Sequence, residues 1–327
     1  TAMAAPSLKG FEKTYQDWSL ICDNTGTCNM AGYPEYYSEH PVSILFTRSA
    51  GEKAPVTAQL ALLREDVGNK TAEIILNGQS LGIVPNISED GNAKLSEKQT
   101  TELLTALKGN ASIEVIFGEF KEKVSDKGAA AAMLKMDEFQ QRLNTPSALI
   151  RQGQEKHAVL APQAAPKIEA VSVNNHKTIE LKRGEKQFKH VLALLRKAYD
   201  GCVDEDLESQ DITLYPLTQN KVLVEALCAS GAYQSTNYYA VLDDKLSKVE
   251  QVLADQYNGV GGDRKQGYAF VRGAYKGRGA GDCWSIQDAV WNGKIFILTS
   301  EWTTGSCKRF PDGAWQLPTF VSDIIVK

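Results

Sequence analysis

The chain has 327 residues, of which 43% are hydrophobic and 23% charged, and its formal net charge is −4 at pH 7. This length allows two domains, and this composition is ordinary for a globular protein. The acidic balance argues against a nucleic-acid-binding protein that relies on phosphate contacts, and no apolar run reaches the roughly 18 residues that a transmembrane helix needs.

Residues 11–150 predict a β-rich domain with two helices. The predicted strands are short runs of strand character at 18–22, 42–48, 56–63, 72–76 and 113–117. Ser96 followed by Gln99 is a capping-box pattern, which predicts a helix that runs to about Lys108. An apolar stripe at helical spacing predicts a second helix over about 127–143.

Residues 151–169 contain an alanine- and proline-rich stretch without periodicity, which predicts an interdomain linker. Residues 170–327 predict a second domain that opens with a strand near Ile179 and a helix over about 185–199. Its further predicted strands are 212–215, 221–228, 238–242, 267–275, 283–291 and 294–302. Helices followed by strands with few crossovers indicate an α+β fold. We therefore predict two β-rich domains, each with an antiparallel sheet and one or two packed helices.

The clearest turn signal is Asn292-Gly293, which lies between the last two predicted strands. A type I′ turn needs φ > 0 at both central residues, and Asn and Gly adopt that conformation at least cost. We therefore expect a two-residue hairpin loop, with Val290 opposite Ile295.

The six cysteines fall as near neighbours in the sequence: Cys22 with Cys28, Cys202 with Cys228, and Cys283 with Cys307. No C-x-x-C motif is present and the four histidines are scattered, so the spacing favours disulfides and predicts no metal site. Disulfides indicate an oxidising compartment. Six cysteines allow fifteen connectivities, so the three neighbour pairs are a prediction from proximity in the sequence. The pair Cys283–Cys307 would close the C-terminal hairpin.

The glycine-rich loop Gly277–Asp282 lacks the Gly-Lys-Ser/Thr ending of a phosphate loop and precedes a strand, so it does not match a nucleotide-binding motif. A structural turn is one interpretation, and partner recognition is the other. In the second interpretation the glycines let a ligand approach the backbone, Arg278 supplies a planar fork of donors, and Trp284 supplies an apolar wall. The candidate binding residues are Arg272, Lys276, Arg278, Asp282 and Trp284.

Basic residues concentrate between positions 264 and 278, in a domain that is otherwise near neutral. They are Arg264, Lys265, Arg272, Lys276 and Arg278. A solvated strand face is the simpler interpretation of this cluster, because scattered surface charge is the default. The functional interpretation is a patch for an anionic partner.

Three features of the sequence are specific: Trp18 with Cys22 and Cys28, the segment LNTP at 143–146, and above all the octapeptide KGRGAGDC at 276–283. Through them the whole chain resembles a family of exported proteobacterial proteins of unknown function. The N-terminal part also resembles the invasion-associated locus B family of small exported β-rich proteins, through its Trp-x-x-x-Cys strand and Ala-rich helix. The resemblance implies a periplasmic protein whose signal peptide has been removed, with no known cofactor and no catalytic residues to assign.

We therefore expect a periplasmic, non-catalytic binding or structural protein whose partner is an unknown protein or envelope component. One alternative is a hydrolase that acts on envelope polymers, and another is an inhibitor or immunity-type protein that blocks a secreted enzyme. An enzyme is expected to show a cleft with two converging titratable groups, whereas a binding protein is expected to show an exposed aromatic or charged patch.

Overall fold

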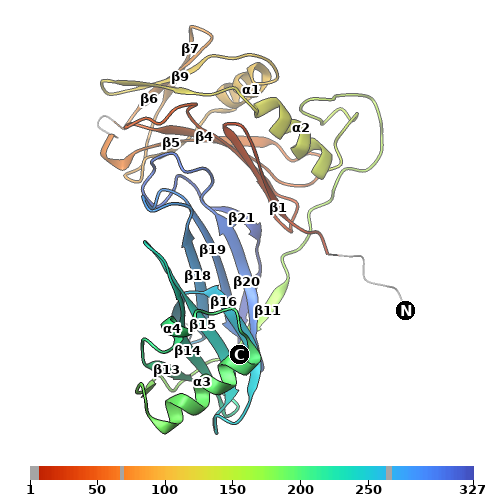
Figure 1. Ribbon diagram of the computed structural model, residues 1–327. Helices are drawn as coiled ribbons and strands as arrows, with labels where there is room; N and C mark the ends of the chain where they lie inside the picture. The colour runs from red at the N-terminus through yellow and green to blue at the C-terminus, as the bar shows by residue number, and fades with distance from the viewer. Residues whose placement is uncertain (1–6, 67–69, 263–266) are drawn as a thin grey trace. The chain divides into compact units, whose positions relative to one another are not determined.

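The computed structural model describes residues 7–66, 70–262 and 267–327 (Figure 1). The chain forms two compact units that interleave along the sequence. Unit 1 comprises Thr1–Ala165, Ala280–Trp284 and Trp302–Val321, and unit 2 comprises Pro166–Gly279, Ser285–Glu301 and Ser322–Lys327. The division into two domains, 11–150 and 170–327, stays a prediction. Unit 1 contains residues from both of these predicted domains.

Unit 1 is built from two antiparallel sheets and short helices. The first sheet contains β1 (Phe11–Tyr15), β2 (Trp18–Cys22), β3 (Cys28–Gly32), β4 (Val42–Arg48), β5 (Val56–Leu62) and β8 (Asn92–Lys94), in that order. The second contains β10 (Phe120–Val124), β9 (Ile113–Phe117), β6 (Ala72–Leu76) and β7 (Gln79–Val84), in that order. The other elements are η1 (Arg64–Asp66), α1 (Glu97–Ala106), α2 (Ala129–Phe139) and the late strand β21 (Leu317–Phe320).

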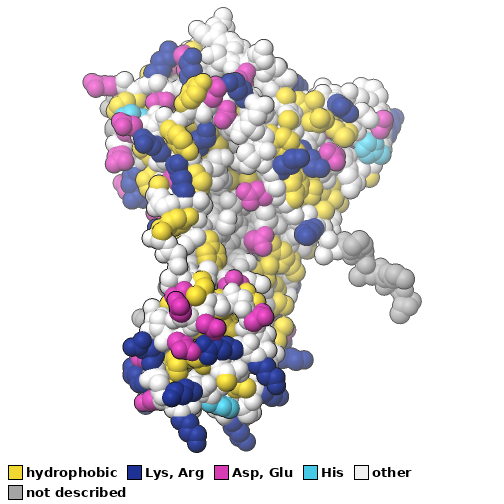
Figure 2. All heavy atoms as spheres, viewed as in Figure 1, with side chains coloured by type: hydrophobic (Ala, Val, Ile, Leu, Met, Phe, Trp, Pro, Cys, Tyr) yellow, Lys and Arg dark blue, Asp and Glu magenta, His cyan; other side chains and the backbone are white. Residues whose placement is uncertain are grey.

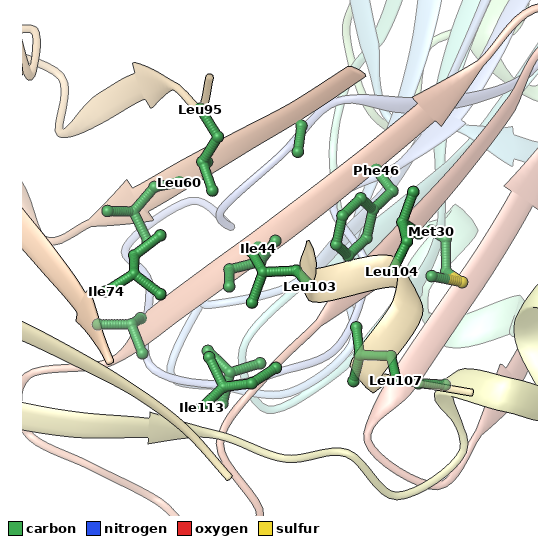
Figure 3. Packing of buried hydrophobic residues seen from close by; sticks show 14 of the residues in the cluster. Met30, Ile44, Phe46, Leu60, Ile74, Leu95, Leu103, Leu104, Leu107 and Ile113 are labelled. Carbon is green, nitrogen blue, oxygen red and sulfur yellow. The ribbon is translucent and has the colours of Figure 1, made fainter. Parts of the chain in front are cut away.

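The main core of unit 1 lies on one face of the six-stranded sheet. Figure 1 shows α1, α2 and the smaller sheet on the same side of β4 and β5. Side chains two apart on a strand point to one face, so Ile44 and Phe46 of β4 both meet the leucines of α1, among them Leu103 (Figure 3). Helix α1 begins at the predicted capping box, which is confirmed: Gln99 N donates to Ser96 Oγ at 3.1 Å and Ser96 N donates to Gln99 Oε1 at 2.9 Å.

The opposite face of the six-stranded sheet is covered by residues 302–321, which we call the covering segment. Its side chains Phe310, Trp315 and Leu317 form one buried cluster with sheet residues of the other parity, which are Ile21, Ala31, Leu45 and Ala61, and with Tyr33 and Leu63, which directly follow β3 and β5. Trp315 Nε1 donates to Ser43 Oγ at 2.8 Å, and that hydroxyl donates to the Gly32 carbonyl at 2.9 Å. The sheet is therefore buried on both faces.

A buried polar network, formed by Arg48, Asp137, Gln140 and Arg142, holds the chain after α2. Arg142 is fully buried and donates to the Gly51 carbonyl at 2.6 Å and to Gln140 Oε1 at 2.9 Å. Asp137 is also fully buried and accepts the Leu149 amide at 2.7 Å. Burial raises the pKa of Asp137 and lowers that of Arg142. The chain leaves the helical path to place these groups, so α2 ends at Phe139 rather than at the predicted 143.

Part of the predicted linker lies against unit 1. Leu160 is buried, its amide donates to the Gln140 carbonyl at 2.9 Å, and its carbonyl accepts the Gly51 amide at 2.8 Å. Gln163 N also donates to the Thr25 carbonyl at 3.0 Å. Residues around Leu160 are thus fixed by hydrogen bonds, and the proposal of a linker over 151–169 stays a prediction.

Unit 2 is built mostly from strands. One sheet has the order β12 (Ile179–Leu181), β13 (Ile212–Pro216), β14 (Lys221–Ser230), β15 (Ser235–Asp243) and β16 (Val249–Tyr257). The second sheet includes β17 (Gly259–Gly262), β18 (Ala269–Lys276), β19 (Trp284–Trp291) and β20 (Phe296–Thr303), whose residues 284, 302 and 303 belong to unit 1. The remaining elements are α3 (Lys186–Ala198), α4 (Asp204–Leu207) and the parallel pair β11 (Lys167–Ala170) and β22 (Asp323–Val326).

Strand β14 shows how the layers of unit 2 are arranged. Val224 packs in a cluster with the apolar face of α3, whose buried residues Phe188, Val191, Leu192 and Leu195 confirm the predicted helix. The neighbouring Leu223 points the other way and packs with Val271 and Trp291 of the second sheet. Helix α3 and the second sheet therefore cover opposite faces of the β12–β16 sheet.

The predicted α+β fold class, with packed helices in each domain, is wrong, because the protein is a β-rich fold. Strands hold 42% of the residues and helices 13%, and the strands of the described part form five sheets. The helices were visible in the sequence through their 3.6-residue period. Strands such as β10 and β16 were missed because most of their residues are only partly buried or exposed, so no apolar alternation marks them.

The hairpin between β19 and β20 exists, but its loop is longer than the predicted two-residue turn. It spans residues 292–295, and Asn292 N donates to the Ile295 carbonyl at 3.1 Å. Asn292 Oδ1 accepts the amides of Lys294 and Ile295, each at 2.9 Å, and of the two central residues expected only Gly293 has a positive φ. The Asn292 side chain closes the loop, which leaves Val290 and Ile295 outside the expected pairing.

Candidate functional site

The predicted binding residues of unit 2 take part in contacts within the protein. Arg272 on β18 donates through Nε and one terminal nitrogen to the two oxygens of Asp288, at 2.7 and 2.8 Å, and this bond raises its pKa. The Lys276 amide donates to Gln234 Oε1 at 2.8 Å, and Arg278 is half-buried. Arg272 is therefore already paired in a bidentate geometry, the one suited to a carboxylate ligand.

The other two predicted residues belong to unit 1. Asp282 is buried and accepts the Arg309 amide at 2.7 Å. Trp284 is half-buried, its indole donates to the Gly281 carbonyl at 2.9 Å, and its amide donates to Thr304 Oγ1 at 2.8 Å. These bonds suit a structural loop, and partner binding by the five residues stays a prediction.

The remaining residues of the predicted basic cluster cannot be placed in a patch. Arg264 and Lys265 lie outside the described residues. On the face of unit 2 that Figure 2 shows, Lys and Arg side chains stand among Asp and Glu side chains.

In the part of the chain that the structure describes, Asp282 with Cys283 and Cys307 brings three metal-ligand atoms close together, but the two sulfurs form a disulfide and offer no thiolate.

A pocket of about 530 Å³ lies within unit 2, at one end of the core between its two sheets. We call it the intersheet pocket. It is lined by Val173, Asn175, His176, Thr178, Tyr215, Pro216, Leu217, Leu223, Val260, Gly261, Gly267, Tyr268 and Ala269. Buried Val173 and Leu223 belong to the core cluster, whereas His176 and Thr178 are exposed at the rim. A concave, mainly apolar pocket of this size is the usual form of a small-molecule site.

The fold places the polar part of Tyr215 away from a ligand. Its hydroxyl donates to Glu225 Oε1 at 3.2 Å, and the hydroxyl of Tyr239 donates to Oε2 of the same carboxylate. Glu225 lies directly opposite Tyr239 on the neighbouring strand, so the three side chains share one face of the sheet. Burial, together with the Glu225 carboxylate, raises the pKa of both phenols well above their usual range. Both tyrosines therefore stay neutral, and Tyr215 presents mainly its ring.

No pattern in the sequence indicated this pocket. Tyr215 and Ala269 were placed on predicted strands, but Val260 lies on β17, which was not predicted, and His176 was treated as an isolated histidine. Residues from five separated segments line the pocket, and only the packing of two sheets brings them together. A local pattern carries no information of that kind.

A family described as a protein of unknown function, DUF1176, matches residues 12–322. The chain belongs to this family. No curated protein matches the chain. The DUF1176 description assigns no activity.

The three disulfides join Cys22 to Cys28, Cys202 to Cys228 and Cys283 to Cys307, as sequence proximity predicts. Cys22 and Cys28 are direct partners across β2 and β3, so the turn between them is closed covalently. Three disulfides suggest an extracytoplasmic protein, because such bonds persist in oxidising compartments. Among the described helices, none is long and apolar enough to cross a membrane.

Proposed function

We propose that this protein is a periplasmic, non-catalytic binding protein that takes the apolar body of a small molecule into the intersheet pocket. The observation that carries the proposal is the lining of the pocket. Its described residues are mostly aliphatic, aromatic or glycine, and they include no Asp, Glu, Lys or Arg. Burying apolar ligand surface in such a pocket stabilises the complex by about 25 cal/mol per Å² before ordering costs are subtracted.

Export to the periplasm is the second part of the proposal. It is supported by the three disulfides and by the resemblance of the octapeptide at 276–283 to exported proteobacterial proteins. The likeness of the N-terminal part to the invasion-associated locus B family points to the same compartment.

Binding without catalysis is the third part. A hydrolase is expected to show two titratable groups that converge on the substrate, and no carboxylate lies beside His176 in the described lining of the pocket. Glu225 is the carboxylate that bonds to the pocket wall, and its two oxygens are engaged by the phenols of Tyr215 and Tyr239. An acid so engaged supports the wall rather than attacking a ligand.

The test is titration of the oxidised protein with N-phenyl-1-naphthylamine, a neutral apolar dye whose fluorescence rises in apolar surroundings. We expect saturable binding that Val260→Trp weakens about tenfold or more, because an indole at this wall fills the pocket. The matched control is Val252→Trp on β16, where the valine is 38% exposed and does not line the pocket.

Two results would contradict the proposal. One is a protein that does not bind the dye at all, and the other is equal affinity for the dye in the wild type and in Val260→Trp. Circular dichroism spectra of both variants check that the added indole leaves the sheets intact.

A further inference from the structure

We infer that the ligand of the intersheet pocket is an amphipathic acid, with an apolar body in the pocket and a carboxylate held at the rim by His176. This inference rests on the proposed function and deepens it, since it adds the charge of the ligand. It makes binding depend on the protonation of one imidazole. The ligand class is that of aliphatic or aromatic carboxylic acids.

His176 lies at the outer end of the intersheet pocket. It lies in the loop between β11 and β12, is exposed, and lines the pocket that buried Val173 and Leu223 close at the core end. A ligand whose body lies against Val173 and Leu223 therefore has its outer end beside an imidazole. Protonated imidazole donates from both ring nitrogens, which suits a carboxylate.

The titratable side chains around His176 determine which charge a ligand can carry. The other titratable side chains of the described lining are Tyr215 and Tyr268, and Lys177 follows His176 in the chain. Tyr215 is kept neutral by burial and by Glu225. Within the described lining, His176 is therefore the side chain that can carry a positive charge and none is a carboxylate, so the lining favours an anion over a cation.

The Tyr215 hydroxyl is already used by a hydrogen bond inside the protein. The hydroxyl of Tyr215 would be the natural partner for a neutral alcohol inside the pocket, but it donates to Glu225. A ligand hydroxyl buried there would have to compete with a carboxylate for that donor. Polar recognition is thus left to the rim, where the ligand head group also keeps contact with water.

The experiment compares three ligands with the same ten-carbon chain, which are decanoate, decanol and decyltrimethylammonium, each below its micelle concentration. Displacement of the apolar dye from the oxidised full-length protein gives the affinities. Between about pH 8 and about pH 6, where an imidazole becomes protonated, we expect decanoate to gain about threefold to fivefold in affinity relative to decanol. The cation should lose affinity over the same range.

Two variants assign the effect to His176. His176→Gln keeps a polar side chain without the charge, and should abolish the change in the decanoate-to-decanol ratio. His176→Lys keeps a positive charge, and should hold that ratio in favour of decanoate at both pH values. Because His176 is exposed, neither change should alter the melting temperature by more than about a degree or two.

The inference is overturned when the ratio in the wild type does not change with pH, or when His176→Gln retains the change. In both cases decanol still binds, and the proposed function stands. If none of the three ten-carbon ligands displaces the dye, the proposed function itself is contradicted. A 1-naphthoate arm separates aromatic from aliphatic acids, since it shares the carboxylate and differs only in the body.

Discussion

Replacing Trp315 by alanine is expected to lower the free energy of unfolding by about 3–5 kcal/mol, the usual cost of removing a buried aromatic ring. Trp315 is 9% exposed and packs with Phe310 and Leu317 over the second face of the six-stranded sheet. The change also leaves the Ser43 hydroxyl without its indole donor. The cavity and the lost hydrogen bond therefore both lower the free energy of unfolding.

Urea denaturation monitored by circular dichroism measures this loss. Trp315→Phe should cost less, because it keeps most of the ring and gives up the bond to Ser43, worth about 1 kcal/mol. The matched control is Tyr36→Ala, since Tyr36 is 77% exposed and its removal should change stability little. Equal stabilities of Trp315→Ala and Tyr36→Ala would show that the covering segment does not stabilise the sheet.

Replacing Arg142 by alanine is expected to destabilise the protein by about 3–5 kcal/mol, because it removes one partner from a buried charged network. Arg142 donates to the Gly51 carbonyl and to Gln140, so these buried acceptors lose their donors. Asp137 would keep Arg48, at 3.9 Å, as its remaining cation. Loss of the positive charge should raise the pKa of Asp137 further, since Arg142 now lowers it.

The control for this variant is Arg64→Ala. Arg64 pairs with Asp90 through exposed side chains, and an exposed pair contributes about 0–1 kcal/mol. Adding Asp137→Asn to Arg142→Ala should recover part of the lost stability, because the unpaired buried charge is removed. A double variant less stable than the sum of the two single changes would contradict this account of the network.

Local signals in the sequence predicted local structure well. The Ser96–Gln99 pair is a capping box in the structure, and the spacing of Phe188, Val191 and Leu195 gave the buried face of α3. Each signal lies within about one turn or a few turns of helix, so it needs no knowledge of the fold. The predicted fold class was wrong because strand content depends on pairing with strands that are distant in the sequence. Such pairing makes short, partly exposed strands possible.

The candidate site illustrates the same limit. The loop at 277–282 was conspicuous in sequence for its glycines, yet Asp282 is buried and bonded to the Arg309 amide. The intersheet pocket was invisible, because Val173, Tyr215 and Val260 are ordinary apolar residues until two sheets place them around one space. Composition can flag an unusual loop, whereas concavity arises only from tertiary packing.

The covering segment also determines when the six-stranded sheet can be completed during synthesis. Its bond from Trp315 to Ser43 joins residues 272 positions apart, so β2–β5 leave the ribosome long before the residues that cover their second face. Contacts so distant in sequence slow folding, and an uncovered apolar sheet favours aggregation in the meantime. A chain that is kept unfolded until its last residues have emerged avoids this interval, because both faces of the sheet can then be buried in one step.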